Sequence, residues 1–276
     1  MISDDRADQP AGASVTDKAT WIPEGVADTV PSAARMYDYL LGGGHNFAVD
    51  REMIDKLNAV APVVGQMARC NRAFLRRAVL ALVERGVRQF LDIGSGIPTV
   101  GNVHEIAQQA DPQARVVYVD NEPVAVSHSE LVLEGNDRAT AILADMRDPA
   151  AILGHPKTQQ LLDFDAPIGL LMVTVFHYVA DTDGPMELMA RYREALVPGS
   201  YLTLSHLCAD FDSADLACIV SLMKETPNPV HPRTRAAITD LFTDFDLLEP
   251  GLVPVAQWRS GQASDLPFLA GVGIKR

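Results

Sequence analysis

The sequence predicts an α/β protein built on a doubly wound, mostly parallel sheet of seven strands that ends in an antiparallel pair. Two observations predict this class. After residue 87, short apolar segments alternate with segments of helical period, as in parallel sheets with helices on both faces. The last two apolar segments are joined by a loop without room for a regular helix, so we expect them to run antiparallel.

The chain divides into three parts. Residues 1–28 are polar and acidic with scattered Pro and Gly, which is typical of a flexible tail. Residues 29–86 have helical patterns and form a predicted helical lid, and residues 87–276 form the predicted α/β core. The helices expected in the lid cover residues 31–41, 51–62 and 66–86.

The core elements follow in order along the chain. The run at 167–179 is apolar almost throughout, as expected of a central strand that is covered on both faces. A Pro-Gly pair ends the helix expected at 185–199. The expected strands cover residues 89–94, 114–120, 140–148, 167–179, 200–207, 245–255 and 267–276. The expected helices cover residues 101–110, 123–135, 185–199, 215–225 and 233–242.

Composition restricts the partners and the compartment. The 23 Lys and Arg against 36 Asp and Glu leave a net charge of −13, which disfavours nucleic acid and favours a small-molecule substrate. No apolar run reaches the roughly 18–20 residues of a membrane span, and the start lacks a secretory pattern. Cys70, Cys208 and Cys218 have no metal-like spacing. We therefore expect a cytoplasmic protein without a membrane or metal partner.

A glycine turn ends the first strand of the core. In "FLDIGSGIP" (90–98), apolar residues lead into Asp92, Gly94, Ser95 and Gly96. A residue without a side chain allows both a sharp turn and close approach of a ligand. The turn lies at the carboxyl end of its strand, where open α/β sheets bind ligands.

The next two strands each end in an acid. Asp120, with Asn121 beside it, ends the second strand, and Asp145 and Met146 follow the third. A carboxylate at Asp120 can accept hydrogen bonds from both hydroxyls of a ribose. Asp145 can accept from an adenine amino group while the Met146 amide donates to the ring. The alternatives are an ordinary loop acid at Asp120 and a helix cap at Asp145. Together, the three strand ends predict a nucleoside site.

The glycine loop also indicates which nucleoside binds. A dinucleotide site usually has a third glycine, but residues 97–99 are Ile-Pro-Thr, which disfavours a nicotinamide-dependent oxidoreductase. Asp92 suits a ligand that carries an ammonium group. S-adenosylmethionine fits these features because it combines adenine, ribose, an amino-acid end and a positive sulfonium.

The segments "LDIGSG", "VYVDNEP" and "ILADMRD" resemble the motifs of class I S-adenosylmethionine-dependent methyltransferases. More narrowly, "PSAARMYDYLLGGGHNFAVDREM" with "FLDIGSGIPT" resembles an actinobacterial group called the S-adenosyl methyltransferase family, formerly a domain of unknown function. The likeness extends from about Val30 to the C-terminus. It implies a Rossmann-like fold and S-adenosylmethionine as cofactor, and it leaves the methyl acceptor open.

A second glycine-rich stretch, "LLGGGHNF" (40–47), follows a helix and so is not the cofactor loop. Gly42 stands where a left-handed residue ends a helix. We expect residues 35–47 to cover the methionine end of the cofactor and the substrate pocket, with Tyr37, His45 and Asn46 as contacts. The alternative is a helix hairpin that packs on the sheet.

His177 and Tyr178 follow the fourth strand, where the transferred group is expected. His177 is the candidate general base because a histidine pKa near 6.5 suits proton removal at neutral pH. The alternative is a hydrogen-bonded histidine that holds the strand end. The predicted function is methyl transfer to a small molecule, and the alternative is a cofactor-binding protein without catalysis.

Overall fold

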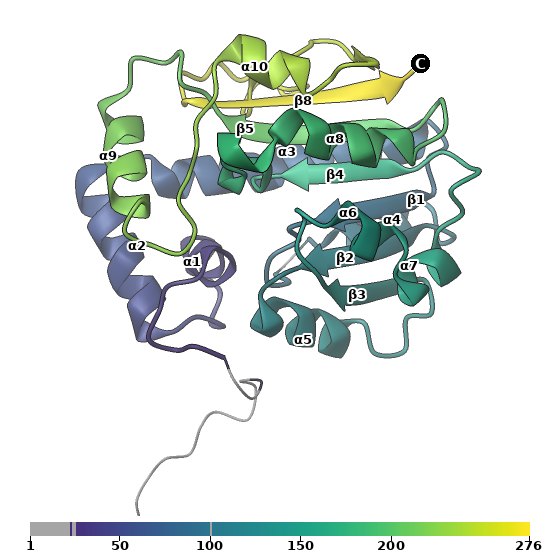
Figure 1. The fold of residues 1–276 in the computed structure, drawn as a ribbon, viewed down its shortest axis with the longest axis horizontal. Coiled ribbons are helices and arrows are strands. Elements are labelled where there is room, and N and C mark those ends of the chain that lie inside the picture. The colour runs from purple at the N-terminus through teal and green to yellow at the C-terminus, as the bar shows by residue number, and fades with distance from the viewer. Residues whose placement is uncertain (1–22, 24–25, 100) are drawn as a thin grey trace, which may run out of the picture.

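The computed structural model describes residue 23, residues 26–99 and residues 101–276 (Figure 1). Within this part of the chain the core is one sheet with the strand order β3-β2-β1-β4-β5-β8-β6, and β7 pairs with β8. The strands are β1 (Gln89–Ile93), β2 (Arg115–Asp120), β3 (Ala139–Leu143), β4 (Gly169–Val173), β5 (Tyr201–Leu207), β6 (Phe245–Leu247), β7 (Val253–Pro254) and β8 (Phe268–Lys275). The tail expected over residues 1–28 lies almost entirely outside the described residues.

Strands β1 to β5 pair in parallel, and β8 runs antiparallel to both β5 and β6. The predicted mostly parallel sheet with an antiparallel C-terminal pair is therefore confirmed. Seven strands form one continuous path, and the two-residue β7 adds an eighth beside β8.

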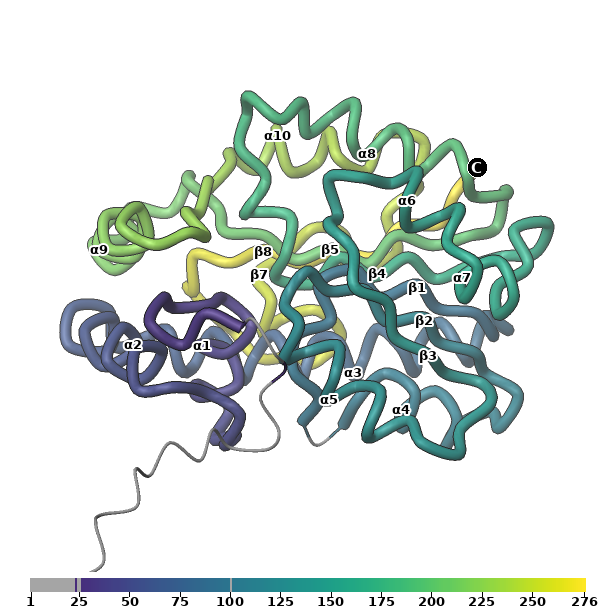
Figure 2. Tube along the Cα trace, turned by 60° about the horizontal axis from the view of Figure 1, so that its bottom comes forward, coloured from purple at the N-terminus to yellow at the C-terminus, as the bar shows by residue number. Residues whose placement is uncertain are grey.

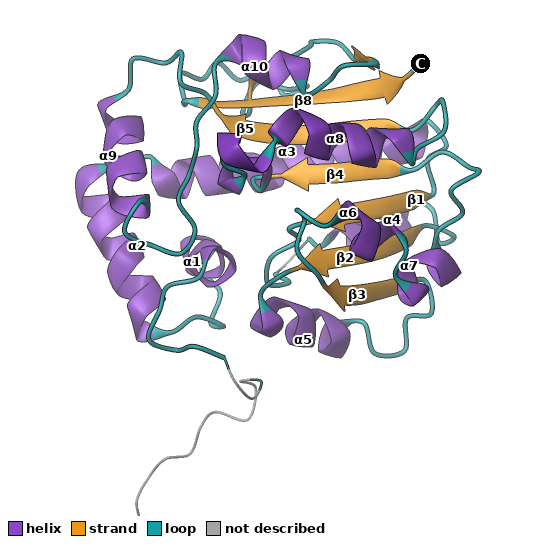
Figure 3. Ribbon diagram, in the orientation of Figure 1, coloured by secondary structure: helices purple, strands orange, loops and turns teal. Residues whose placement is uncertain are grey.

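Helices cover both faces of the sheet (Figure 3). They are α1 (Ala33–Leu40), α2 (Ala48–Val60), α3 (Val64–Glu84), α4 (Val103–Ala110), α5 (Pro123–Val132), α6 (Pro149–Leu153), α7 (Pro156–Leu161), α8 (Pro185–Glu194), α9 (Ala214–Met223) and α10 (Arg235–Asp240). Among the described residues, the two large apolar cores lie one on each face. Phe74 of α3 packs with Phe90 on one face, and Tyr192 of α8 packs with Leu170 on the other.

Three predicted strands are too long. The third was expected over 140–148, but β3 ends at Leu143, and a loop follows that leads to Asp148, the N-cap of α6. The fourth was expected over 167–179, but β4 ends at Val173 because Thr174 has a φ of 65° and the chain then forms the short 3-10 helix η1 (Phe176–Tyr178). The sixth was expected over 245–255, but a turn with Gly251 at φ 86° separates β6 from β7. In the last two places a left-handed residue interrupts the extended chain inside an apolar run.

A helical cap, which we define as α1, α2 and α9, lies at the carboxyl edge of the parallel strands (Figures 1 and 2). Helix α2 packs against α1 and α9, and the Ala33 amide donates to Asn228 Oδ1 at 3.2 Å. Helix α3 extends from the cap to the sheet, where it packs against β4, β5 and β8. The cap therefore stands over the strand ends that were expected to bind a nucleoside. None of the helices in the described residues is both long and apolar enough to span a membrane.

Candidate functional site

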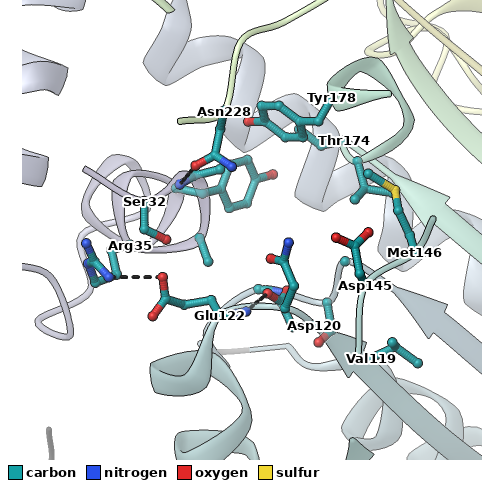
Figure 4. Close-up of a pocket in the computed structure, with 18 of the residues that line it drawn as sticks. Ser32, Arg35, Val119, Asp120, Glu122, Asp145, Met146, Thr174, Tyr178 and Asn228 are labelled. Atoms are coloured by element: carbon teal, nitrogen blue, oxygen red, sulfur yellow. Dashed lines mark hydrogen bonds and ion pairs between the residues drawn. The ribbon is translucent and has the colours of Figure 1, made fainter. Parts of the chain in front are cut away.

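A cavity of about 530 Å³ opens between the carboxyl ends of β1 to β4 and the cap. Figure 4 shows Asp120 and Asp145 on one side of it, with Tyr178 and Asn228 opposite. Ten of the thirteen residues predicted for the site line this cavity: Tyr37, Asp92, Gly94, Ser95, Gly96, Asp120, Asn121, Asp145, Met146 and Tyr178. The cavity has the size of a small-molecule site.

The glycine loop takes a conformation that favours glycine. Gly94 and Gly96 both have a φ of 69°. A Cβ on Gly94 would lie 2.2 Å from a methyl group of Val175, whereas nothing lies within 4 Å of the Cβ position of Gly96. Gly94 is therefore needed for packing, and Gly96 leaves free space along the cavity for a ligand.

The Asp120 carboxylate is fixed by backbone donors. It accepts from the Gly96 amide at 2.8 Å and from the Glu122 amide at 2.9 Å, and it is buried. Burial raises the pKa of Asp120 to about 6, while these backbone hydrogen bonds act in the opposite direction. A carboxylate in this setting gains from further hydrogen-bond donors, such as ligand hydroxyls.

Asp92 and Arg72 place opposite charges in the same part of the cavity. Burial raises the pKa of Asp92 to about 7, nearby Arg72 lowers it, and Asp120 raises it further. Arg72, on α3, donates to Thr99 Oγ1 at 3.1 Å and to the Gly101 carbonyl at 3.2 Å. A carboxyl and a guanidinium together complement the two charges of an amino-acid group.

Asp145 pairs with Arg147, to which the sequence motifs assigned no role. Arg147 donates to both Asp145 oxygens, through Nε at 3.0 Å and Nη2 at 2.6 Å, and these bonds lower the pKa of Asp145. The Tyr192 hydroxyl donates to the Met146 carbonyl at 2.7 Å, which fixes this strand end to α8.

A buried polar network connects α3 to β4 and β5, and sequence reasoning missed it. Asn71 donates to the Tyr37 hydroxyl at 3.0 Å and also to Thr174 Oγ1. Ser205 Oγ donates to Asn71 Oδ1 at 2.7 Å and accepts from the Thr174 amide at 2.9 Å. A polar residue on the apolar face of the predicted α3 was the available signal, because buried polar groups need partners.

A buried ion pair fixes the cap to β2. Arg35 lies 2.9 Å from Glu122 and 2.8 Å from Asp50, and it donates to the carbonyls of Ala27 and Val30. Figure 4 shows the pair of Arg35 and Glu122 at the rim of the cavity. These contacts hold the chain before α1 against the carboxyl edge of the parallel strands.

His45 and Asn46 do not line the cavity. The His45 amide and the Asn46 side chain both donate to Asp38 Oδ2, at 2.9 and 2.8 Å. The His45 ring centroid lies 3.7 Å from that of His128 on α5. A Cβ on Gly43 would lie 1.9 Å from Asp38 Oδ1, so the triple glycine allows the loop to wrap closely around this carboxylate.

His177 lies outside the large cavity, and it lines a smaller one beside it. Its side chain is buried, and Nδ1 has no hydrogen-bond partner among the described residues. Burial, with His206, Arg233 and His231 nearby, lowers the pKa of His177 well below its ordinary value, so the ring is neutral. Tyr178 lines both cavities, and burial raises its pKa.

Within the described ranges, no group of three or more His, Cys, Asp or Glu side chains is arranged to hold a metal ion. The site consists instead of a glycine turn, separate acids on successive strands and a covering cap.

Comparison with known proteins finds a matching family model and similar crystal structures. A family model described as S-adenosyl methyltransferase matches residues 19–275. The chain is 37% identical to a predicted methyltransferase from Thermobifida fusca whose crystal structure superposes with a TM-score of 0.88, covering 94% of this chain and 100% of that one. It is 36% identical to a DUF574 family protein from Streptomyces avermitilis, with a TM-score of 0.85 over 90% of this chain and 98% of that one.

More distant structures share the fold alone. The mitomycin 7-O-methyltransferase MmcR is 18% identical, with a TM-score of 0.51 over 77% of this chain and 56% of that one. No curated protein matches the chain significantly.

Proposed function

The chain belongs to the S-adenosyl methyltransferase family, and from this premise we propose that it transfers the methyl group of S-adenosylmethionine to a small molecule held beneath the cap. The observation that carries the proposal is the cavity itself. Residues 94–96 of the glycine loop, Asp120 and Asp145 come from three different strand ends and line one cavity. Methyltransferase activity and the cofactor follow from the family, whereas the acceptor and the residue roles are inferred.

The residues present fit the adenosyl part of the cofactor. Space beside Gly96 receives the ligand against the loop backbone, and Asp120 has carboxylate oxygens for the ribose hydroxyls. Asp145 and Met146 stand where an adenine would be recognised. Asn121, beside Asp120, lines the same part of the cavity.

The opposite charges of Asp92 and Arg72 fit the amino-acid end. In this assignment the ionised carboxylate of Asp92 pairs with the ammonium group, and Arg72 faces the carboxylate. Arg72 is already directed by its bonds to Thr99 and Gly101, so little side-chain entropy is lost when a ligand binds.

When bound, S-adenosylmethionine would supply a methyl group on a positively charged sulfur: an acceptor lone pair would bond to the methyl carbon while the carbon–sulfur bond breaks and its electrons stay on sulfur. The protein's own part is to position the two reactants and to exclude water. Alignment of two reactants can supply on the order of 7–11 kcal/mol of the acceleration. Tyr37, Thr174 and Tyr178 line both cavities and therefore stand between the cofactor side and the His177 side.

A proton must leave when the acceptor atom carries one. His177 Nδ1 is buried, neutral and without a partner in the described part of the chain, so it can accept that proton. We assign His177 as the general base on this ground. Tyr178, whose raised pKa keeps its hydroxyl protonated, is assigned to orient the acceptor.

A small acceptor is supported by enclosure and charge. The cap stands over the strand ends, and Arg35 with Glu122 fixes it there. The net charge of −13 disfavours polyanionic acceptors.

The test is transfer of an isotopically labelled methyl group. The protein is incubated with labelled S-adenosylmethionine and a cell metabolite extract, and labelled products are sought by mass spectrometry. We expect one labelled compound that forms in step with S-adenosylhomocysteine and is absent with the Asp120→Ala variant. Tight binding of S-adenosylhomocysteine with no labelled product from any extract would favour a binding protein without catalysis.

A further inference from the structure

A second cavity of about 100 Å³ lies against the first and is not explained by cofactor binding. The two cavities share Ala33, Tyr37, Thr174 and Tyr178 as lining residues. The second one extends between the cap helices, α3 and the start of β8. It therefore begins where the cofactor cavity ends.

The lining of this second cavity is apolar, soft and aromatic. Met36, Met67 and Met223 come from α1, α3 and α9, and Phe268 comes from β8. Thioether side chains adapt their shape and make favourable contacts with the edges of aromatic rings. This combination favours an aromatic occupant over a polar one.

The size limits that occupant to one ring. A protein cavity of about 150 Å³ lined by Leu, Ile and Phe binds benzene. At about 100 Å³, the present cavity holds a single ring only with adjustment of its methionines, and it excludes a fused ring system.

Besides the hydroxyls of Tyr37, Thr174 and Tyr178 in the shared wall, one further polar group stands in this apolar lining. His177 is 3% exposed, and its Nδ1 has no partner among the described residues. A buried nitrogen without a partner costs free energy, and a donor on a ligand removes that cost. The ring that occupies the cavity should therefore carry a hydroxyl or amino group.

We propose that this cavity binds the aromatic ring of the methyl acceptor, a single-ring phenol or aniline whose polar atom lies near the shared wall of Thr174 and Tyr178. The inference rests on the proposed function, because it assigns the acceptor side of the same site. It adds a substrate class, which neither the glycine loop nor the strand-end acids define.

The experiment measures binding of 4-methylphenol to protein saturated with S-adenosylhomocysteine, by ligand-observed NMR. Saturation keeps the probe out of the cofactor cavity. The first variant is Ala68→Leu, which places extra carbons into the second cavity from α3. Its matched control is Ala73→Leu on the same helix, where the side chain is exposed.

We expect 4-methylphenol to bind the wild type, Ala68→Leu to weaken it by about tenfold or more, and Ala73→Leu to change it by less than about twofold. Met67→Ala should enlarge the cavity and admit 2-naphthol, which the wild type excludes. If Ala68→Leu does not fold, Ile219→Phe fills the cavity from α9.

Calorimetry with S-adenosylhomocysteine on the same samples distinguishes failure of the acceptor inference from failure of the proposed function. Wild-type protein that binds S-adenosylhomocysteine but not 4-methylphenol overturns the acceptor inference alone. Equal binding of 4-methylphenol by wild type and by a folded cavity-filling variant overturns it as well. Failure of the wild type to bind S-adenosylhomocysteine overturns the proposed function.

Discussion

The guanidinium of Arg35 lies 2.9 Å from the carboxylate of Glu122, and this pair joins the first helix of the cap to the end of β2. Glu122 comes two residues after Asp120, whose carboxylate accepts a hydrogen bond from the Glu122 amide. The contact that holds the cap and the group assigned to the ribose therefore share one turn of backbone. Movement of the cap and occupancy of the cofactor cavity should be coupled.

Glu122→Gln tests this coupling. Breaking a buried pair by removing one partner typically costs about 3–5 kcal/mol, because the other charge stays buried without compensation. We expect urea denaturation to show a loss of about 3 kcal/mol in the free energy of unfolding, the lower end of this range, since Asp50 still pairs with Arg35.

The control is Glu130→Gln on α5, which removes an exposed ion pair with Lys157 at the same distance of 2.9 Å. That change should cost no more than about 1 kcal/mol. Equal costs for the two variants would show that the cap does not depend on Glu122.

Asp120→Asn tests recognition of the ribose. An asparagine side chain has only one acceptor oxygen, so its amide nitrogen would face either the Gly96 or the Glu122 amide donor. Wild-type protein should bind 5′-methylthioadenosine about 10-fold or more tighter than its 2′-deoxy analogue. The variant should lose this preference as well as affinity. Asp137→Asn, at an exposed aspartate, is the control and should keep it. A preference that persists in Asp120→Asn would exclude the ribose assignment.

The raised pKa of Asp92 makes cofactor affinity depend on pH. The groups that face Asp92 are Arg72 from α3 and Asp120 and Tyr118 from β2. Below about pH 7 the free protein holds Asp92 protonated, whereas the ammonium group of the ligand needs the carboxylate. Binding of S-adenosylhomocysteine should then release a proton and weaken by up to about tenfold per pH unit below pH 7. Calorimetry in buffers of different ionisation enthalpy measures both effects.

Stability of the free protein has the opposite dependence. An acid whose folded pKa is raised from 3.8 to about 7 contributes stability that is fully present below pH 3.8 and is lost as pH rises through 7. Asp92→Asn should remove this loss of stability with rising pH. Asp120, whose pKa is also raised, still causes a smaller loss in the same direction. Affinity that stays constant from about pH 5.5 to 8 in the wild type would refute the pairing of Asp92 with an ammonium group.

His177→Ala separates catalysis from structure. A positioned general base contributes about 10²–10⁴-fold to the rate, so labelled product should form that much more slowly. Affinity for S-adenosylhomocysteine should not change, because His177 does not line the cofactor cavity. The lowered pKa of His177 also predicts that wild-type turnover is not lost by protonation of this base between pH 8 and pH 6. Full turnover in a variant with normal cofactor affinity would leave His177 as a structural residue.

The sequence was sufficient to predict which strand ends line one cavity and which cofactor the family uses. Asp92, Gly96, Asp120 and Asp145 were predictable because parallel strands bring their carboxyl ends to one edge, so local motifs acquire a common location. The pattern of apolar runs likewise predicted the antiparallel end of the sheet. These features depend on local periodicity and on topology, both of which a single sequence contains.

Contacts between distant segments were not predictable in this way. Asn71 and Ser205 are 134 positions apart, and nothing in either segment names the other as partner. The triple glycine was a signal of close approach, but the approaching group is the Asp38 carboxylate. A glycine shows that space is short and does not show what fills it. Contacts of His45 and Asn46 with the cofactor stay a prediction.

Gly43→Ala tests whether this loop is built around Asp38. The added Cβ would meet Asp38 Oδ1, and the carboxylate cannot move without loss of its bonds to the His45 amide and to Asn46. We expect a loss of about 1–3 kcal/mol in the free energy of unfolding, as for other overpacked sites. Gly44→Ala is the matched control, because nothing lies within 4 Å of its Cβ position and its φ is not positive. It should leave stability unchanged or raise it by up to about 1 kcal/mol.

A double-mutant cycle with Asp38→Ala gives the decisive comparison. Once the carboxylate is gone, Gly43→Ala should cost little further, so the two changes should be strongly non-additive. Affinity of folded Gly43→Ala for S-adenosylhomocysteine should stay close to that of the wild type, because Gly43 does not line the cofactor cavity. Additive costs would show that Gly43 is required for another reason. A large loss of affinity in the folded variant would instead place the loop against the cofactor, as the glycine pattern first indicated.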